Sequence, residues 1–266
     1  MKPFNTLFIV FLLCALIPLS AHGSQITVFD GQKKPTTNPW HHQTGEDQEV
    51  EPYAVSTQKW DLEGMFFDGS DLSIVGGWDF IHGVDGIHSG DIFISTQGPV
   101  TFGGDTVVGD NQSEDILNSF GYNFVFDVDW EHFADAGLNK KIIPYTLWEI
   151  DETTIVTTAT ALDASNPVAF KRHATGKIQT GFITYESHLT DAQTGFKGDP
   201  YNIASHFQIS GFDLTNILGK DKTFTAHFTQ ECGNDAIMGQ VPEPATLILL
   251  GMGLIGIGAI GRKLPL

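Results

Sequence analysis

Residues 122–131 read YNFVFDVDWE, and an apolar side chain stands at every second position of this stretch. In an extended strand, successive side chains point to opposite faces of the sheet. The apolar set that would share one face is Tyr122, Phe124, Phe126, Val128 and Trp130. The alternation predicts a β-strand with that face turned toward a hydrophobic core.

Short segments of the same kind recur along the chain. Each is rich in β-branched or aromatic residues and is bounded by Gly, Asp, Asn or Pro. They cover residues 72–75, 91–94, 143–147, 154–160, 181–185 and 223–229, whereas helical patterns cover only 114–120, 131–136 and 214–218. The pattern predicts a mainly β protein whose body, residues 53–240, is a single antiparallel β-sandwich of the jelly-roll or lectin-like type.

The chain is strongly acidic. Its 266 residues include 14 Lys and Arg against 32 Asp and Glu, a formal charge of −18. Residues 24–241 hold 11 Lys and Arg and 31 Asp and Glu, and 11 − 31 gives −20 for this part. Such a charge argues against nucleic acid as a partner and against general binding to anionic lipid.

The first 23 residues have the pattern of a signal peptide. Lys2 precedes an apolar run over residues 7–19, and Ala21-His22-Gly23 places small residues before Ser24. The run is too short to span a bilayer comfortably but suits the apolar region of a secretory signal. We therefore expect export, with cleavage before Ser24.

Residues 24–52 are predicted to form an N-terminal strand followed by a flexible loop. The part from 31 to 52 has three prolines and an acidic run at 46–51, with only Trp40 and Val50 as large apolar groups. Such a segment cannot bury enough apolar surface to order itself.

The C-terminus has three ordered parts. They are a Pro-Glu-Pro box at Pro242, Glu243 and Pro244, an uncharged stretch at 245–261, and a basic pair at Arg262 and Lys263. At ~1.5 Å per residue, a transmembrane helix over the uncharged stretch would reach ~26 Å, just short of the ~30 Å hydrocarbon core. The basic pair would stay on the cytoplasmic side, which leaves the box outside.

This tail, residues 241–266, closely resembles the PEP-CTERM sorting signal of Gram-negative bacteria. The resemblance implies a membrane-embedded exosortase as a transient partner and a location in the cell envelope, at the cell surface or in the extracellular matrix. It also implies an association with exopolysaccharide and biofilm. The body motifs at 76–80, 90–94 and 227–235 look like those of a group of exosortase-dependent surface proteins, and this second resemblance supplies no catalytic residue.

The other face of the 122–131 strand is acidic. It carries Asp127, Asp129 and Glu131 beside Asn123 and Val125. Carboxylates spaced ~7 Å apart along a strand repel one another, so they either stay in water or recruit a cation. Three interpretations remain open, namely a solvated acidic face, a calcium site with oxygen ligands and a glycosidase-like carboxylate pair.

A second group of oxygen-bearing side chains surrounds Gly233. Glu231, Asn234 and Asp235 are suitable ligands for a hard cation, but the same residues are also ordinary turn formers. Calcium is therefore the candidate cofactor, with these three residues and the three acidic residues of the 122–131 strand as its candidate ligands.

Other residues give weaker functional signals. Cys232 is the sole cysteine of residues 24–241, so no intramolecular disulfide is expected, and a nucleophilic role with His227 lacks a supporting motif. The pair His41-His42 has no zinc ligand at a matching spacing. The five tryptophans could stack on sugars but are more often core residues in a β-sandwich.

Together these observations predict an exported, exosortase-sorted surface or matrix protein that is not an enzyme. One alternative is a calcium-assisted carbohydrate-binding module. Another is a hydrolase that acts on polysaccharide, which would need two carboxylates facing one cleft.

Overall fold

The structure is a computed structural model of the chain, and it describes residues 23–30, 57–101, 113–159, 165–199, 201–202, 204–220 and 222–241. The predicted signal peptide up to residue 22, the loop at 31–52 and the sorting residues from Pro242 to Lys263 lie outside the described residues. In the described part, no helix has the length and apolar character needed to cross a membrane.

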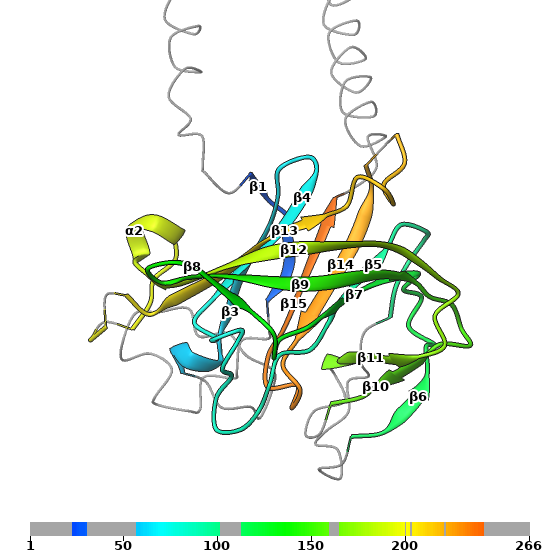
Figure 1. Cartoon of the computed structure of the whole chain (residues 1–266), viewed down its shortest axis with the longest axis horizontal. Coiled ribbons are helices and arrows are strands. Elements are labelled where there is room, and N and C mark those ends of the chain that lie inside the picture. Colours follow the sequence, from blue (N-terminus) through cyan, green and yellow to red (C-terminus); the bar gives the residue numbers. More distant parts are fainter. Residues whose placement is uncertain are drawn as a thin grey trace, which may run out of the picture.

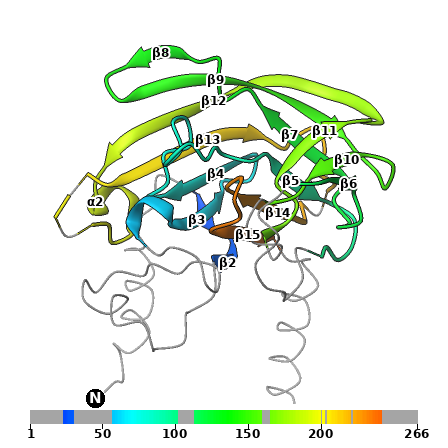
Figure 2. The ribbon, with the colours of Figure 1, turned by 90° about the horizontal axis from the view of Figure 1, so that it is seen from below.

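Most of the described chain forms one large antiparallel sheet that curls nearly into a barrel (Figures 1 and 2). Its strands are β1 (Ser24–Gln25), β2 (Thr27–Asp30), β3 (Leu62–Phe67), β4 (Asp71–Gly76), β5 (Ile92–Ser95), β7 (Phe124–Val128), β8 (Ala134–Gly137), β9 (Lys140–Glu149), β12 (Gly176–Leu189), β13 (His206–Asp213), β14 (Phe224–Thr229) and β15 (Ala236–Val241). The order across the sheet is β1-β3-β4-β13-β12-β9-β7-β5-β14-β15-β2, and β8 pairs with β9 off this path.

A small second sheet lies beside β7 (Figure 1). Its order is β11-β10-β6, with β6 at Asp115–Leu117, β10 at Ile155–Thr157 and β11 at Ala169–Arg172. The described helices are both short, the 3₁₀ turn η3 (Gln58–Trp60) and α2 (Asp191–Thr194).

The N-terminal segment joins the two ends of the large sheet. β1 pairs with β3, and β2 pairs with β15. Between them, the backbone N–H of Ile26 donates to the Met65 oxygen of β3 at 2.9 Å, and the Ile26 oxygen accepts from the Gln240 N–H of β15 at 2.8 Å. One segment thus closes the curl and covers strand edges that would otherwise be open.

Two apolar cores lie on opposite faces of the central strands. In β5, Ile92 and Ile94 belong to the main core inside the curled sheet, whereas Phe93 belongs to a second core on the side of the small sheet. In β7, Phe126 and Val125 divide between the two cores in the same way. Because both faces are covered, these strands consist of nearly continuous apolar residues.

The mainly β, antiparallel class is confirmed, but the arrangement differs from two facing sheets of a sandwich. The described strands form one large curled sheet with a small sheet packed on its outer face. The face predicted for the 122–131 strand also needs correction, because Tyr122 precedes β7 and packs in the second core. Its ring contacts Phe93, with 5.7 Å between ring centroids, and stacks on His227.

The predicted helices are not formed. Residues 115–117 are strand β6, residues 134–137 are strand β8, and residues 215–217 form a turn. All three patterns are short, and in β6 and β8 pairing with a neighbouring strand supplies the backbone hydrogen bonds that a short isolated helix cannot stabilise. The short helix α2 was not predicted.

Candidate functional site

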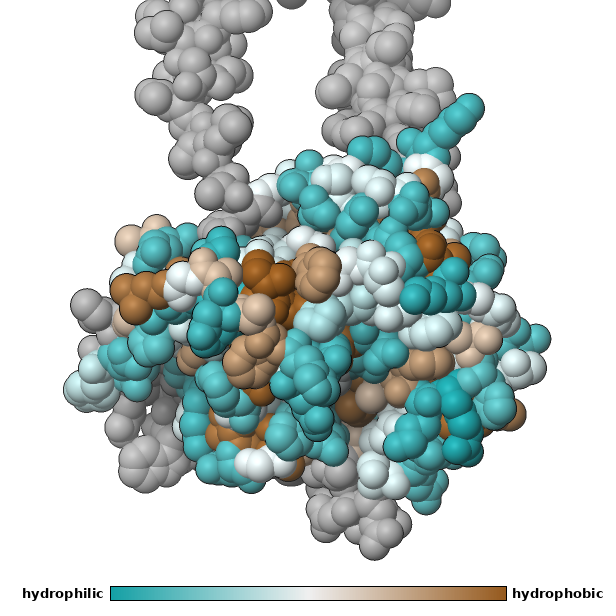
Figure 3. All heavy atoms as spheres, in the orientation of Figure 1, coloured by the Kyte–Doolittle hydropathy of each residue, from teal (hydrophilic) through white to brown (hydrophobic). Residues whose placement is uncertain are grey.

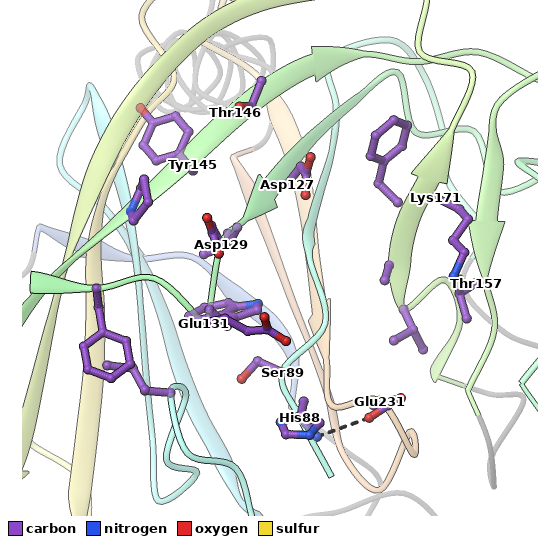
Figure 4. Close-up of a pocket in the computed structure, with 18 of the residues that line it drawn as sticks. His88, Ser89, Asp127, Asp129, Glu131, Tyr145, Thr146, Thr157, Lys171 and Glu231 are labelled. Carbon is purple, nitrogen blue, oxygen red and sulfur yellow. Dashed lines mark hydrogen bonds between the residues drawn. The ribbon is translucent and has the colours of Figure 1, made fainter. Parts of the chain in front are cut away.

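A hollow of about 1050 Å³ lies between the large sheet and the small sheet (Figure 4). The end of β7, the following residues up to Phe133, and parts of β9 and β12 form one side, and β10 and β11 form the other. His88, Ser89 and Glu231 also line it. On the molecular face seen in Figure 3, apolar groups occur in separate patches among hydrophilic side chains.

Asp127 enters the hollow from β7. Its Oδ2 accepts a hydrogen bond from Trp148 Nε1 at 3.1 Å. Burial raises the pKa of Asp127, and the nearby charge of Asp129 raises it further. Asp127 is therefore less solvated than Asp129 and Glu131, which are exposed.

Asp129 and Glu131 follow the end of β7. The Asp129 N–H donates to the Pro144 oxygen at 3.0 Å, which holds this segment against β9. Asp129 Oδ1 lies 2.8 Å from His132 Nδ1, and this hydrogen bond raises the pKa of His132. Glu131 is exposed.

Glu231 reaches the hollow from the turn after β14. Its Oε2 accepts a hydrogen bond from the His88 N–H at 3.3 Å, drawn as the dashed line in Figure 4. The Glu231 N–H in turn donates to the His88 oxygen at 2.9 Å. This reciprocal pair fixes the turn beside the hollow.

Gly90 and Asp91 join the two sheets beneath the hollow. Asp91 Oδ1 accepts from the Val128 N–H at 3.0 Å and Oδ2 accepts from the Phe170 N–H at 2.8 Å, so one carboxyl group ties β7 to β11. A Cβ at Gly90 would come within 2.4 Å of the Val168 oxygen, which explains the glycine. Burial, reinforced by the charge of Asp127, raises the pKa of Asp91 to about 8.

Aromatic side chains make up much of the apolar lining. They are Trp130, Phe133, Tyr145, Phe170 and Phe182. Phe182 is 69% exposed and Phe133 is 40% exposed, so both present ring surface to solvent. Trp130 is fixed by a 3.0 Å hydrogen bond from its Nε1 to the Gly90 oxygen.

Four of the six candidate calcium ligands line the hollow, namely Asp127, Asp129, Glu131 and Glu231. Asn234 and Asp235 are buried and do not line it. Asp235 instead accepts hydrogen bonds from the backbone N–H groups of Leu62, at 2.7 Å, and Ala236, at 2.8 Å. In the described ranges, no three His, Cys, Asp or Glu side chains form a group that could hold a metal ion, and calcium binding stays a prediction.

The other candidate residues have mainly structural surroundings. Trp60 and Trp78 pack together in the main core, with 5.3 Å between ring centroids. His227 is fully buried, donates from Nε2 to the Ser165 and Pro167 oxygens, and has its pKa lowered to about 4 by burial. Cys232 is half-buried, and burial raises the pKa of its thiol.

Several lining residues were not singled out in the sequence. Lys171 and Thr157 lie across the hollow from Asp127, on the small sheet, which the sequence did not predict as a separate unit (Figure 4). Phe182 carried a readable signal, because strand alternation puts it on the face opposite the buried residues Ile183 and Tyr185.

The strand register places Glu231, which lines the hollow, at the end of the β14–β15 hairpin opposite Val241. Phe224 pairs with Val241 at one end of the β14–β15 hairpin, and Thr229 pairs with Ala236 at the other. Glu231 follows Thr229, so this part of the hollow lies about five residues, or ~17 Å, along the hairpin from Val241.

Comparison with known families identifies the segment that begins at the end of β15. The chain carries the PEP-CTERM protein-sorting motif, whose family model matches residues 240–263, as the sequence predicts. This motif implies an exported protein that an exosortase processes and that is sorted to the cell envelope or surface. Comparisons with curated proteins and with solved structures gave no match.

Proposed function

We propose that this protein is a non-enzymatic component of the cell surface or extracellular matrix of a Gram-negative bacterium, and that its hollow binds exopolysaccharide of the biofilm. The observation that carries the proposal is the joint lining of the hollow by exposed aromatic rings and hydrogen-bonding side chains. Sugar rings pack their C–H faces on aromatic side chains, while their hydroxyl groups need polar partners.

The position of the hollow supports this role. A domain held to the envelope through the segment after Val241 has Glu231 at the far end of the β14–β15 hairpin. The hollow would then face away from the attachment point, where long polymers are accessible.

Binding to the host's own extracellular polysaccharide tests the proposal. The full chain, purified in detergent, should be retained by immobilised polysaccharide, and Phe182→Ala should reduce retention at least about threefold because a stacking surface is lost. Tyr201→Ala is the matched control, since Tyr201 is 94% exposed and lies outside the lining. Equal retention of the two variants would remove the hollow from the proposal, and no retention of the wild type would end it.

Calcium-assisted binding is a second candidate, because Asp127 and Asp129 are interacting carboxylates in the lining of the hollow. Extracellular calcium sites bind at ~10⁻⁴ to 10⁻³ M, so a few millimolar calcium would stabilise the domain by ~1 to 2 kcal/mol. The melting temperature should rise by a few degrees, and the double change Asp127→Asn, Asp129→Asn should abolish the rise. An equal rise with magnesium would indicate general screening of acidic repulsion instead.

The third candidate, a hydrolase acting on polysaccharide, uses the same carboxylates as acid and base. Release of reducing ends from the host polysaccharide, lost in Glu131→Gln, would support it. We expect no such release from the wild type.

A further inference from the structure

We infer that the hollow selects cationic ligands, and that within the proposed polysaccharide-binding function its ligand is a polymer of sugars with protonated amino groups. The choice of a sugar as ligand rests on the proposed function. The choice of an amino group on that sugar rests on the charge of the lining.

The charged side chains that line the hollow are mostly negative. Among the described residues that line the hollow, four carboxylates stand against the ammonium group of Lys171, a formal charge of −3 with histidines neutral. None of the four forms an ion pair with a lysine or arginine in the described part of the chain. Asp129 pairs only with His132, which compensates its charge only when protonated.

Repulsion makes anionic polysaccharides poor ligands. A uronate or sulfate group in the hollow would face a lining of net negative charge, and like charges juxtaposed in a partly desolvated site are costly. A protonated amine reverses the sign of this interaction and forms charge-assisted hydrogen bonds to carboxylate oxygens.

The aromatic lining favours the same ligand. Phe182 exposes ring surface in the lining, and an ammonium group above an aromatic ring gains a further electrostatic attraction, as Lys141 Nζ does at 5.5 Å from the centroid of the Phe133 ring. The hydroxyl-bearing side chains of Thr146 and Thr180 complete a lining suited to an amino sugar.

The size of the hollow favours a polysaccharide over a basic protein segment. At about 1050 Å³ the hollow is at the upper end of the range of small-molecule sites, ~300 to 1000 Å³. One lysine side chain would fill a small part of it, whereas several sugar rings would use the aromatic and acidic surfaces together.

Two sugars of the same linkage and length, one with free amino groups and one with acetylated amino groups, test the inference. The full chain in detergent is titrated calorimetrically at about pH 6 with a β-1,4-linked glucosamine trimer and with its N-acetylated counterpart, because only the first carries protonated amines. We expect the amine trimer to bind at least about tenfold more tightly. In Glu131→Gln, Glu231→Gln, which removes two lining carboxylates that have no histidine ion pair in the described residues, the preference should fall below about threefold.

A charge-matched control separates the hollow from the general acidity of the protein. Asp85→Asn, Glu152→Gln removes two exposed carboxylates outside the lining and should keep the preference. Equal or tighter binding of the acetylated trimer, no binding of the amine trimer, or an equal loss in both double variants would overturn the inference. Retention on the host polysaccharide is measured separately, so the proposed function can stand when the inference fails.

Discussion

His206 and Glu63 form a buried pair between β13 and β3, with 2.8 Å between Nδ1 and Oε2. Glu63 Oε1 also accepts from Gln58 Nε2 at 2.8 Å, and His206 Nε2 lies 3.1 Å from Oδ1 of the exposed residue Asp191. Burial alone would lower the pKa of His206, but the hydrogen bonds and charges of Glu63 and Asp191 outweigh it and raise the pKa. This cluster holds η3, α2 and the two strands together.

Removing either buried partner should be far more costly than removing the exposed one. Glu63→Ala or His206→Ala leaves a buried polar or charged group without its partner and should lower the free energy of unfolding by ~3 to 5 kcal/mol. Asp191→Asn, at the exposed end, should cost less than ~1 kcal/mol. Urea unfolding monitored by tryptophan fluorescence measures all three, and equal effects would contradict the assigned roles.

The same cluster should make stability depend on pH. Because the pKa of His206 is raised in the folded state, its contribution is complete below the unfolded pKa of ~6.5 and is lost as the pH rises through the folded pKa. The free energy of unfolding should therefore fall above about pH 6.5, and His206→Gln should reduce this fall. An unchanged profile in the variant would assign the pH dependence to other groups.

Asp91 should add a separate pH dependence at lower pH. Its folded pKa of about 8 lies above the ordinary value of 3.8, so between these values the folded protein keeps a proton that the unfolded chain loses. Stability should thus decrease with rising pH from about 4 to 8, by on the order of 5 kcal/mol for a shift of this size. Asp91→Asn should flatten this slope, whereas the exposed control Asp85→Asn should keep it.

The sequence predicted the strands better than their arrangement. Alternation and flanking turn residues located β5, β7, β9 and β14, because these signals are local. Curling depends on long-range pairing, in which Ile26 bridges Met65 and Gln240, and no local pattern encodes that contact. The small sheet was missed for the same reason, since β6 and β10 pair across about forty residues.

The local sequence pattern was enough to place some candidate ligands together, whereas the role of the others is decided by tertiary contacts. Asp127, Asp129 and Glu131 line one hollow, as their position at the end of a strand allowed. Asp235 resembled a ligand in sequence, yet its carboxylate caps backbone N–H groups in the core, because a buried N–H needs an acceptor. Residue type alone cannot distinguish these two uses of a carboxylate.

Cys232 should be a structural thiol of low reactivity. Burial raises its pKa, so the thiolate that reacts with alkylating reagents is scarce at neutral pH. Cys232→Ser should cost at most ~1 to 2 kcal/mol of stability and leave polysaccharide retention unchanged. Iodoacetamide labelling should be slow in the folded protein and faster in urea, and loss of binding with the fold retained would show that the thiol has a functional role.

Deleting residues 242–266 should separate export from sorting. β15 ends at Val241, and the deletion leaves the whole strand in place. Its pairs with neighbouring strands, such as Val241 with Phe224 of β14 and Gly239 with Thr27 of β2, remain, so the truncated protein should fold. Because the family match begins at residue 240, the deletion removes nearly all of the sorting motif. The protein should then be exported and released into the medium rather than kept in the envelope.

The basic pair of the tail gives a finer test. Arg262→Glu with Lys263→Glu should disturb membrane insertion or processing, because positive charge after an apolar stretch keeps that end on the cytoplasmic side. Lys177→Glu with Lys220→Glu makes the same charge change at exposed sites of the folded domain and should leave sorting intact. Immunoblots of medium and envelope fractions distinguish the variants. Envelope association unchanged by both the tail deletion and the tail charge reversal would mean that the domain itself, through its hollow or its surface, holds the protein at the cell.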